Sequence, residues 1–408
     1  MKKLLLSLAI ASAITGCGGG ETLEDVKNDN PPVLPTATVK FDPANSVISV
    51  PNDLLMSGTL DGTLNMPGEL DDNNVSVERA AYADPQLALG ALDGWSTQTP
   101  FKIDLTFPAG ISLDMTSAAS PGAVRIFEVV MGASQTDETC SQVPAGIACK
   151  LVSELTFGVD FITQGSGDAV AVIPLKPFKA GSTYINVLTT SLMDSEGRSI
   201  EPSSTYALVS EETTLITDSQ KSLQAAINSY EDAVTSGGAI TKDEIIYSAA
   251  MTMQSAGQVL GTVKQLLAAS LTQDALPTPM VQIPEQPVIT VEQVFASQGV
   301  TGLSPVFGGV QYQKGSVMLP MYLATPTGTT VDDLSATYWQ GLCDSGVAVL
   351  GYAAAAGDSF PTDPISETDG LCMALSDGKL RDLGLDQTKH LTKYNTIPKT
   401  QSIANVPV

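Results

Sequence analysis

The chain has few positive charges. Its 408 residues include 44 acidic residues and only 20 Lys and Arg, so the formal net charge is −24 at pH 7. Surfaces that bind nucleic acid or anionic lipid electrostatically need clusters of Lys and Arg. We therefore expect no nucleic-acid partner and no electrostatic docking on anionic membranes.

The sequence also lacks a GxSxG pentapeptide, the motif that exposes a serine nucleophile on a sharp turn between a strand and a helix. Ser96, Ser134 and Ser304 each follow a glycine by two positions, but none has the second glycine. A hydrolase of the common serine type needs that turn. The sequence therefore gives no nucleophile of this type.

A weaker hydrolase signal is GDSF at residues 357–360, which resembles the opening block of GDSL hydrolases. A triad would use Ser359 with Asp386 and His390. That family places its histidine far downstream in Asp-x-x-His, whereas Asp386 and His390 are close by and have three residues between them. We interpret Ser359 as a loop serine and His390 as a surface histidine, and expect no catalytic residue in this chain.

Metal-binding patterns are missing as well. His390 is the only histidine, so the ligand spacing of a zinc site cannot be formed. Residues 69–74, ELDDNN, are a candidate calcium loop, but an EF-hand counted from Asp71 has Val75 and Ser76 where Asp or Asn and then Gly are required. We interpret residues 69–74, which begin with Glu69, as a solvated acidic loop and expect neither a metal nor a cofactor.

The N-terminus carries an export signal. An apolar run at residues 4–14 follows two lysines and is far shorter than the roughly 20 residues that cross a bilayer, which predicts a signal peptide. Residues 14–17, ITGC, match the lipobox of bacterial lipoproteins; a plain secretory cleavage site is the alternative. We expect residues 1–16 to be removed and Cys17 to be acylated, with residues 17–36 as a flexible tether.

The residue after Cys17 is glycine rather than aspartate, which resembles the outer-membrane sorting pattern of Gram-negative lipoproteins. The expected partner of the acyl chains is therefore the outer membrane, with the protein at the cell surface or on the periplasmic face.

The four remaining cysteines form an even number, which in an exported chain indicates disulfides. Three pairings are possible, and proximity favours Cys140 with Cys149 and Cys343 with Cys372.

Residues 37–275 have the pattern of a β-rich domain. Alternating or apolar segments at 101–107, 124–131, 169–174 and 184–188 are bounded by Gly, Pro and Ser, as in antiparallel sandwiches, and residues 172–200 resemble bacterial immunoglobulin-like modules. Amphipathic helices are predicted near 217–235 and 255–270. Thr241 opens a capping-box pattern that predicts one helical turn and then a strand at 245–253.

A second region is predicted at residues 276–408. Four prolines between residues 277 and 287 mark the boundary, and residues 315–323 form a predicted strand. The apolar stretch 346–357 is too short to span a membrane.

Several long segments carry a family resemblance: FDPANSVISVPNDLLMSGTLDGTLNMP and ALDGWSTQTPFKIDL, then VQYQKGSVMLPMYLATP, YWQGLCDSGVAVL and HLTKYNTIPK. In these segments the chain resembles the bacterial virulence-factor lipases, which are secreted or lipid-anchored lipases and lysophospholipases of Gram-negative bacteria. In that family an α/β-hydrolase core with the GxSxG serine follows. The resemblance implies a mixed α+β fold, in which an immunoglobulin-like sandwich with a helical insertion precedes an incomplete hydrolase lead-in.

The resemblance sets the functional expectation. We expect the non-catalytic N-terminal portion of a lipase-like surface lipoprotein, truncated before its catalytic core, with anchoring and platform roles. A lipid or ester substrate would be reached through the missing domain. The alternative is a stand-alone outer-membrane lipoprotein that binds a partner through its β-domain. The segment from Ile403 to Val408 is predicted to be an unfinished strand edge. The region after about Gln387 is therefore expected to be poorly ordered or aggregation-prone when alone.

Overall fold

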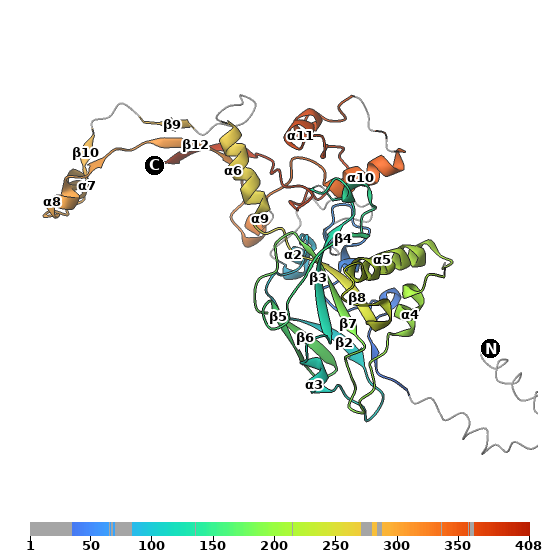
Figure 1. The fold of residues 1–408 in the computed structure, drawn as a ribbon. Coiled ribbons are helices and arrows are strands. Elements are labelled where there is room, and N and C mark those ends of the chain that lie inside the picture. Colours follow the sequence, from blue (N-terminus) through green and yellow to red (C-terminus); the bar gives the residue numbers. More distant parts are fainter. Residues whose placement is uncertain are drawn as a thin grey trace, which may run out of the picture.

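The computed structural model describes residues 35–408 apart from 65, 67, 70–83, 135, 214, 271–279, 284–287, 336, 358 and 360–362. The predicted signal peptide, Cys17, most of the tether and the four boundary prolines lie outside the described residues. Figure 1 shows a body of two sheets, a looped region beside it and an extended arm. The mixed class of helices with antiparallel sheets is as predicted.

The body consists of two four-stranded antiparallel sheets. The first has the order β1-β2-β6-β5, with β1 (Thr38–Val39), β2 (Phe101–Thr106), β5 (Phe161–Gly165) and β6 (Ala169–Pro174). The second has the order β4-β3-β7-β8, with β3 (Val124–Met131), β4 (Ala148–Glu154), β7 (Thr183–Thr189) and β8 (Ile245–Thr252). These strands include every strand predicted between residues 101 and 253.

One hydrophobic core lies between and around these sheets. On β2 the side chains of Ile103 and Leu105 are buried while their neighbours are exposed, which is the period of two that a half-buried strand requires. Strands β7 and β8 are buried along their whole length. The same apolar cluster includes residues of both sheets, so burial of these residues holds the sheets together.

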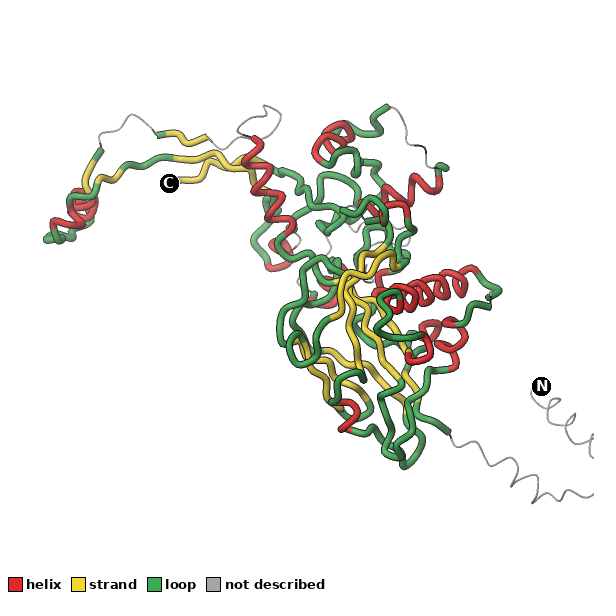
Figure 2. The backbone as a smooth tube through the Cα atoms, in the orientation of Figure 1, coloured by secondary structure: helices red, strands yellow, loops and turns green. Residues whose placement is uncertain are grey.

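The predicted helices form as well. α5 (Asp218–Thr235) begins with a capping box between Thr217 and Gln220 and packs against β4 and β8 (Figures 1 and 2). The prediction near 255–270 is confirmed by α6 (Gln258–Ser270), and the predicted single turn before a strand is confirmed by η4 (Lys242–Glu244) and β8. The remaining helices of the body are short: η1 (Pro43–Asn45), η2 (Asp53–Met56), α2 (Pro85–Gly90), α3 (Met115–Ala118), η3 (Cys140–Gln142) and α4 (Ser204–Ser210).

The second region has less regular structure. The predicted strand near 315–323 is β12 (Ser316–Met321), the centre of the sheet β13-β12-β9 with β9 (Met280–Gln282) and β13 (Ser402–Pro407). A small pair joins β10 (Ile289–Thr290) and β11 (Gln311–Tyr312). The helices here are α7 (Val291–Ser297), α8 (Pro305–Gly308), α9 (Val331–Ser335), α10 (Gly346–Ala355) and α11 (Asp369–Leu375). No helix among the described residues is long and apolar enough to cross a membrane.

The disulfides are those that proximity favours, Cys140 with Cys149 and Cys343 with Cys372. The poor order expected after Gln387 is not found, whereas aggregation of the chain when alone stays a prediction. Residues 388–397 include buried His390, Asn395 and Ile397, and β13 pairs with β12 from Ser402 to Pro407. The order arises because the segment packs on the body through buried polar groups, which its local sequence does not reveal.

Candidate functional site: a buried charged junction

Seven charged side chains gather where the second region meets the body. We call this cluster the charged junction; its members are Asp61, Glu69, Asp344, Asp382, Asp386, Lys389 and His390. Asp61 and Glu69 precede the body's β2, whereas the other five lie beyond residue 340. Buried charges are costly unless they are paired and hydrogen-bonded, so each contact in this junction has an energetic consequence.

The loop at Asp61 positions the first carboxylate. Oδ1 of Asp61 accepts hydrogen bonds from the backbone N–H of Thr63 at 3.0 Å and from its hydroxyl at 2.7 Å, which closes an Asx turn. Gly62 between them has φ +79°, and a Cβ atom there would lie 2.9 Å from the ring of Tyr394. Glycine is therefore required both by the turn and by the close approach of the C-terminal segment.

His390 bridges two carboxylates. Its Nδ1 lies 2.8 Å from Oδ2 of Asp61 and its Nε2 lies 3.2 Å from Oε1 of Glu69, with 3% of the side chain exposed. Burial alone would lower the pKa of His390, but the two carboxylates outweigh burial and raise the pKa to about 9. At neutral pH the ring is thus an imidazolium that neutralises part of the buried negative charge.

The pKa of Asp61 is lowered, as expected for a carboxylate that pairs with a charged imidazolium. Burial would raise this pKa, but hydrogen bonds from His390 and Thr63 together with the charge of His390 lower it. Asp61 therefore stays ionised beside the imidazolium. The two shifts agree that this is an ion pair rather than a pair of neutral groups.

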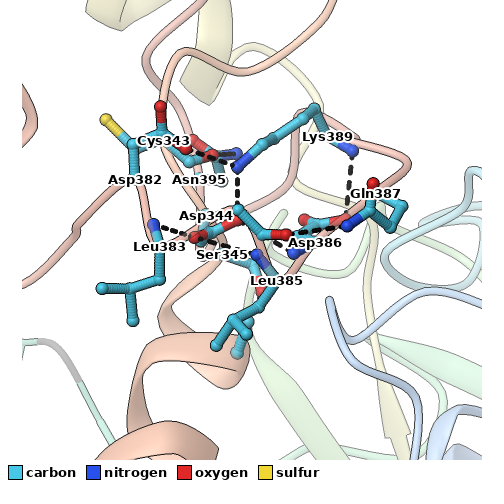
Figure 3. Close-up of polar contacts among 12 residues, drawn as sticks. Cys343, Asp344, Ser345, Asp382, Leu383, Leu385, Asp386, Gln387, Lys389 and Asn395 are labelled. Atoms are coloured by element: carbon cyan, nitrogen blue, oxygen red, sulfur yellow. Dashed lines mark hydrogen bonds and ion pairs between the residues drawn. The ribbon is translucent and has the colours of Figure 1, made fainter. Parts of the chain in front are cut away.

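Asp344 organises the loop that carries His390 (Figure 3). Its carboxylate accepts hydrogen bonds from the backbone N–H groups of Leu383 and Asp386, the latter at 2.9 Å, and it pairs with the ammonium of Lys389. Lys389 also reaches Oδ1 of Asp382 at 3.1 Å. A fully buried carboxylate thus receives backbone donors and one cation, as such a group requires.

Asp386 is the least neutralised acid. Burial and the charge of Asp61 raise its pKa. Its Oδ1 lies 2.8 Å from the hydroxyl of Thr388, which also lies 3.0 Å from Oδ2 of Asp61. The hydroxyl has one proton to donate and two carboxylates beside it. That hydroxyl can donate to only one of the two carboxylates at a time, and Oδ2 of Asp386 is buried without a hydrogen-bond partner among the described residues.

Further contacts extend the junction. Asp93 accepts hydrogen bonds from the backbone N–H of Ser255 at 3.2 Å and of Lys393 at 2.8 Å, so it joins the body to the C-terminal segment. The hydroxyl of Ser345 donates to the carbonyl of Leu60 at 3.1 Å. Beside these groups, a small apolar cluster surrounds one disulfide; its buried members are Cys343, Cys372, Leu380 and Ile397.

Two interpretations made from the sequence are wrong. His390 is buried rather than on the surface, and Glu69 is 1% exposed rather than solvated, because each is the other's ion-pair partner. The calcium candidates from Asp71 onward lie outside the described residues. No group of His, Cys, Asp and Glu in the described part of the chain has an arrangement that could hold a metal.

The structure does not bring a triad together. The hydroxyl of Ser359 donates to the carbonyl of Ala356 at 2.8 Å at the end of α10, while both ring nitrogens of His390 contact carboxylates. No ring nitrogen remains to accept a proton from a serine. The junction can hold two regions together; it offers no activated nucleophile.

One sequence signal could have located the junction. The segments that carry the family resemblance supply Asp61, Asp344 and His390 as members. These segments are separated by most of the chain, and the structure brings them into contact. A shared structural role for the segments was not inferred from the sequence.

Two comparisons with known proteins give matches, and the family match covers the body and the Asp61 side of the junction. A family model described as bacterial virulence factor lipase N-terminal matches residues 35–276. The chain is 30% identical over 186 residues to an extracellular lipase of Aeromonas hydrophila, and the match covers 43% of this chain and 23% of that lipase. The chain thus aligns with about a quarter of that relative. No solved structure matches the chain.

Proposed function

Because the chain belongs to the bacterial virulence factor lipase N-terminal family, we propose that it is the non-catalytic platform of a lipase-type lipoprotein. The observation that carries this proposal is the family match over residues 35–276, which includes both four-stranded sheets and α5. The match confirms the resemblance seen in the sequence. Most of the Aeromonas lipase lies outside the aligned part.

The strand order supports an immunoglobulin-like platform. If the eight strands of the body are lettered in chain order with β4 as C′, the first sheet reads A-B-E-D and the second C′-C-F-G. Immunoglobulin sandwiches have this strand order, which supports the proposal. Helices α4 and α5 lie in the connection between β7 and β8. This is the place of the helical insertion predicted from the sequence.

The charged junction gives the platform a second task. It fixes the segment around His390 to the body through Asp61, Glu69 and the contact of Asp93 with Lys393. Beyond this segment the chain continues into β13. The junction therefore determines where the sheet β13-β12-β9 begins relative to the body.

We propose that this sheet is the lead-in to a hydrolase domain. Val281, Ile403 and Val408 are large apolar side chains on or beside it that are exposed. One edge of β13 pairs with β12, and no strand among the described residues pairs with the other edge. An edge of this kind can bind a further strand. A lipid or ester substrate would then be bound by that further domain.

Membrane attachment is proposed to come from Cys17. Several acyl chains on one residue hold a protein to a membrane stably, where one chain would not. The change Cys17→Ser should release the protein from outer-membrane fractions into the soluble fraction. Unchanged membrane association of this variant, measured by fractionation, would contradict the anchor.

The absence of catalysis is tested by assay. The purified chain should show no turnover of short-chain esters or lysophospholipid above a protein-free blank. Ser359→Ala is the diagnostic variant, and Ser204→Ala on α4 is the matched control. Turnover that is lost in Ser359→Ala and kept in Ser204→Ala would overturn the proposal.

The platform role can be tested in the Aeromonas lipase. Removal of the aligned segment from the Aeromonas lipase should abolish the yield of active enzyme, and replacement by residues 35–276 of this chain should restore part of it. Full activity of the enzyme without the segment would show that no platform is needed.

A further inference from the structure

A small lobe stands at the far end of the arm, away from the body (Figure 1). It comprises residues 288–313, and we call it the tip lobe. Its elements are β10, α7, α8 and β11; β10 pairs with β11, and α7 packs against α8. A capping box between Thr290 and Gln293 begins α7. The lobe therefore has defined local structure although it is far smaller than an independent domain.

The tip lobe exposes apolar side chains without a core beneath them. Val306 is 78% exposed and Phe307 is 67% exposed, both on α8. Gly308 is the one buried residue among residues 288–313. Further large apolar side chains of the lobe are also exposed: Val288, Ile289, Phe295, Val300 and Val310. Many exposed large apolar side chains within one small lobe indicate a site of interaction with a protein or a membrane.

The lobe is also almost free of charge. Glu292 is the single formally charged residue among residues 288–313, in a chain with a net charge of −24. Its other polar side chains are uncharged Gln, Ser and Thr. A second copy of the chain would bring the same large negative charge, which opposes self-association. An uncharged apolar surface faces no such repulsion.

We propose that the tip lobe inserts into the surface of a zwitterionic phospholipid membrane. Val306 and Phe307 would enter the boundary between headgroups and acyl chains, while the uncharged polar residues stay among the headgroups. Because α8 is only one turn long, the lobe rests in the interface and does not cross the bilayer. This contact is separate from the acyl anchor proposed for Cys17 and does not depend on it.

The arm makes this contact geometrically possible. The lobe is the part of the described chain farthest along the arm, so it can touch a flat surface while the acidic body stays away from it (Figure 1). Anionic lipid would attract neither the lobe nor the body, since the chain lacks a cluster of Lys and Arg there. The proposal therefore predicts stronger binding to zwitterionic than to anionic vesicles.

The test uses residues 17–408 with Cys17→Ser, so that neither acyl chains nor the apolar run at residues 4–14 can hold the protein to lipid. Its binding to phosphatidylcholine vesicles and to vesicles with added phosphatidylserine is measured by flotation. Val306→Asp with Phe307→Asp in the same chain should weaken binding to phosphatidylcholine by about tenfold or more, because two apolar side chains are lost from the interface. Val159→Asp with Ile216→Asp, two exposed apolar positions of the body, is the matched control and should bind unchanged.

A second measurement locates the contact. Phe307→Trp should give fluorescence that brominated phosphatidylcholine quenches, beyond the signal from Trp95 and Trp339. The proposal is overturned if the parent chain does not bind phosphatidylcholine, or if the tip and control variants lose binding equally. It is also overturned if the tip variant only abolishes a dimer seen by light scattering, or only abolishes binding to a lipase domain, since either result assigns the lobe to a protein partner.

Discussion

The body and the charged junction are stabilised by different forces. In the body, the two sheets share one large cluster of buried apolar side chains. In the junction, the apolar cluster is small and contains a disulfide, while ion pairs such as Asp61 with His390 and Asp344 with Lys389 supply the contacts. Both regions are buried, but only one is buried because it is apolar.

Because of this difference, the two regions should respond differently to pH and to reductant. Apolar burial depends little on pH, whereas a buried ion pair depends on the protonation of both partners. The junction also includes a disulfide that closes a longer loop than the disulfide of the body. We therefore expect pH and reductant to loosen the junction before they affect the body.

The largest expected loss of stability comes from a substitution in the body. Phe127→Ala on β3 removes a side chain that is 1% exposed and leaves a cavity in the apolar core of the body. The free energy of unfolding should fall by about 4 kcal/mol, measured by urea denaturation. Val152→Ala on β4, an exposed position, is the control and should change it by less than about 0.5 kcal/mol. A Phe127→Ala effect as small as the control's would contradict the shared core.

The second largest expected loss of stability comes from removal of a disulfide, and it should differ between the two disulfides. Cys343→Ser with Cys372→Ser opens a link between residues 29 apart in sequence, whereas Cys140→Ser with Cys149→Ser opens one between residues 9 apart. Loop entropy gives losses of about 3.5 and about 2.5 kcal/mol. Limited proteolysis should show new cleavage near α11 in the first variant only. Equal cleavage of both variants there would show that the disulfide does not hold the junction.

The third effect is a pH dependence. The pKa of His390 is about 9 in the folded chain, above its ordinary value of 6.5. Its contribution is therefore fully present below about pH 6.5 and is lost as the pH rises through about 9, a change of about 3 kcal/mol. Urea unfolding at pH 6 to 9.5 should show the decline. Because the chain has one histidine, no other imidazole contributes.

His390→Gln is the control for this prediction. The amide of glutamine can donate hydrogen bonds to a carboxylate but carries no charge, so the pH dependence in this range should disappear. The variant should also be less stable at pH 6, because Asp61 and Glu69 lose the cation between them. An unchanged decline in His390→Gln would assign the pH dependence to another group.

The smallest effect concerns the cap of α5. Thr217→Ala removes the hydroxyl that accepts from the backbone N–H of Gln220 and should lower the free energy of unfolding by about 1 kcal/mol. Ser222→Ala, an exposed position within the helix, should be neutral or slightly stabilising. The loss should be equal at pH 6 and pH 9. A loss confined to one pH would connect this helix to the charged junction.

Local sequence patterns determined the elements of this protein. Alternation of apolar residues located β2, a helical period located α5, and the pattern at Thr241 located one turn followed by β8. Proximity in sequence selected both disulfides. These inferences succeeded because each depends on residues a few positions apart, where backbone geometry alone decides which side chains share a face.

The tertiary structure alone decided the junction. Asp61 and His390 are 329 positions apart, and neither has a local pattern that indicates an ion pair. A single histidine followed by Leu and Thr is typical of a surface loop, and an acidic stretch such as the one beginning at Glu69 is typical of solvent. Burial reverses both interpretations: once the segments are packed together, each charge is stable only because the other is present.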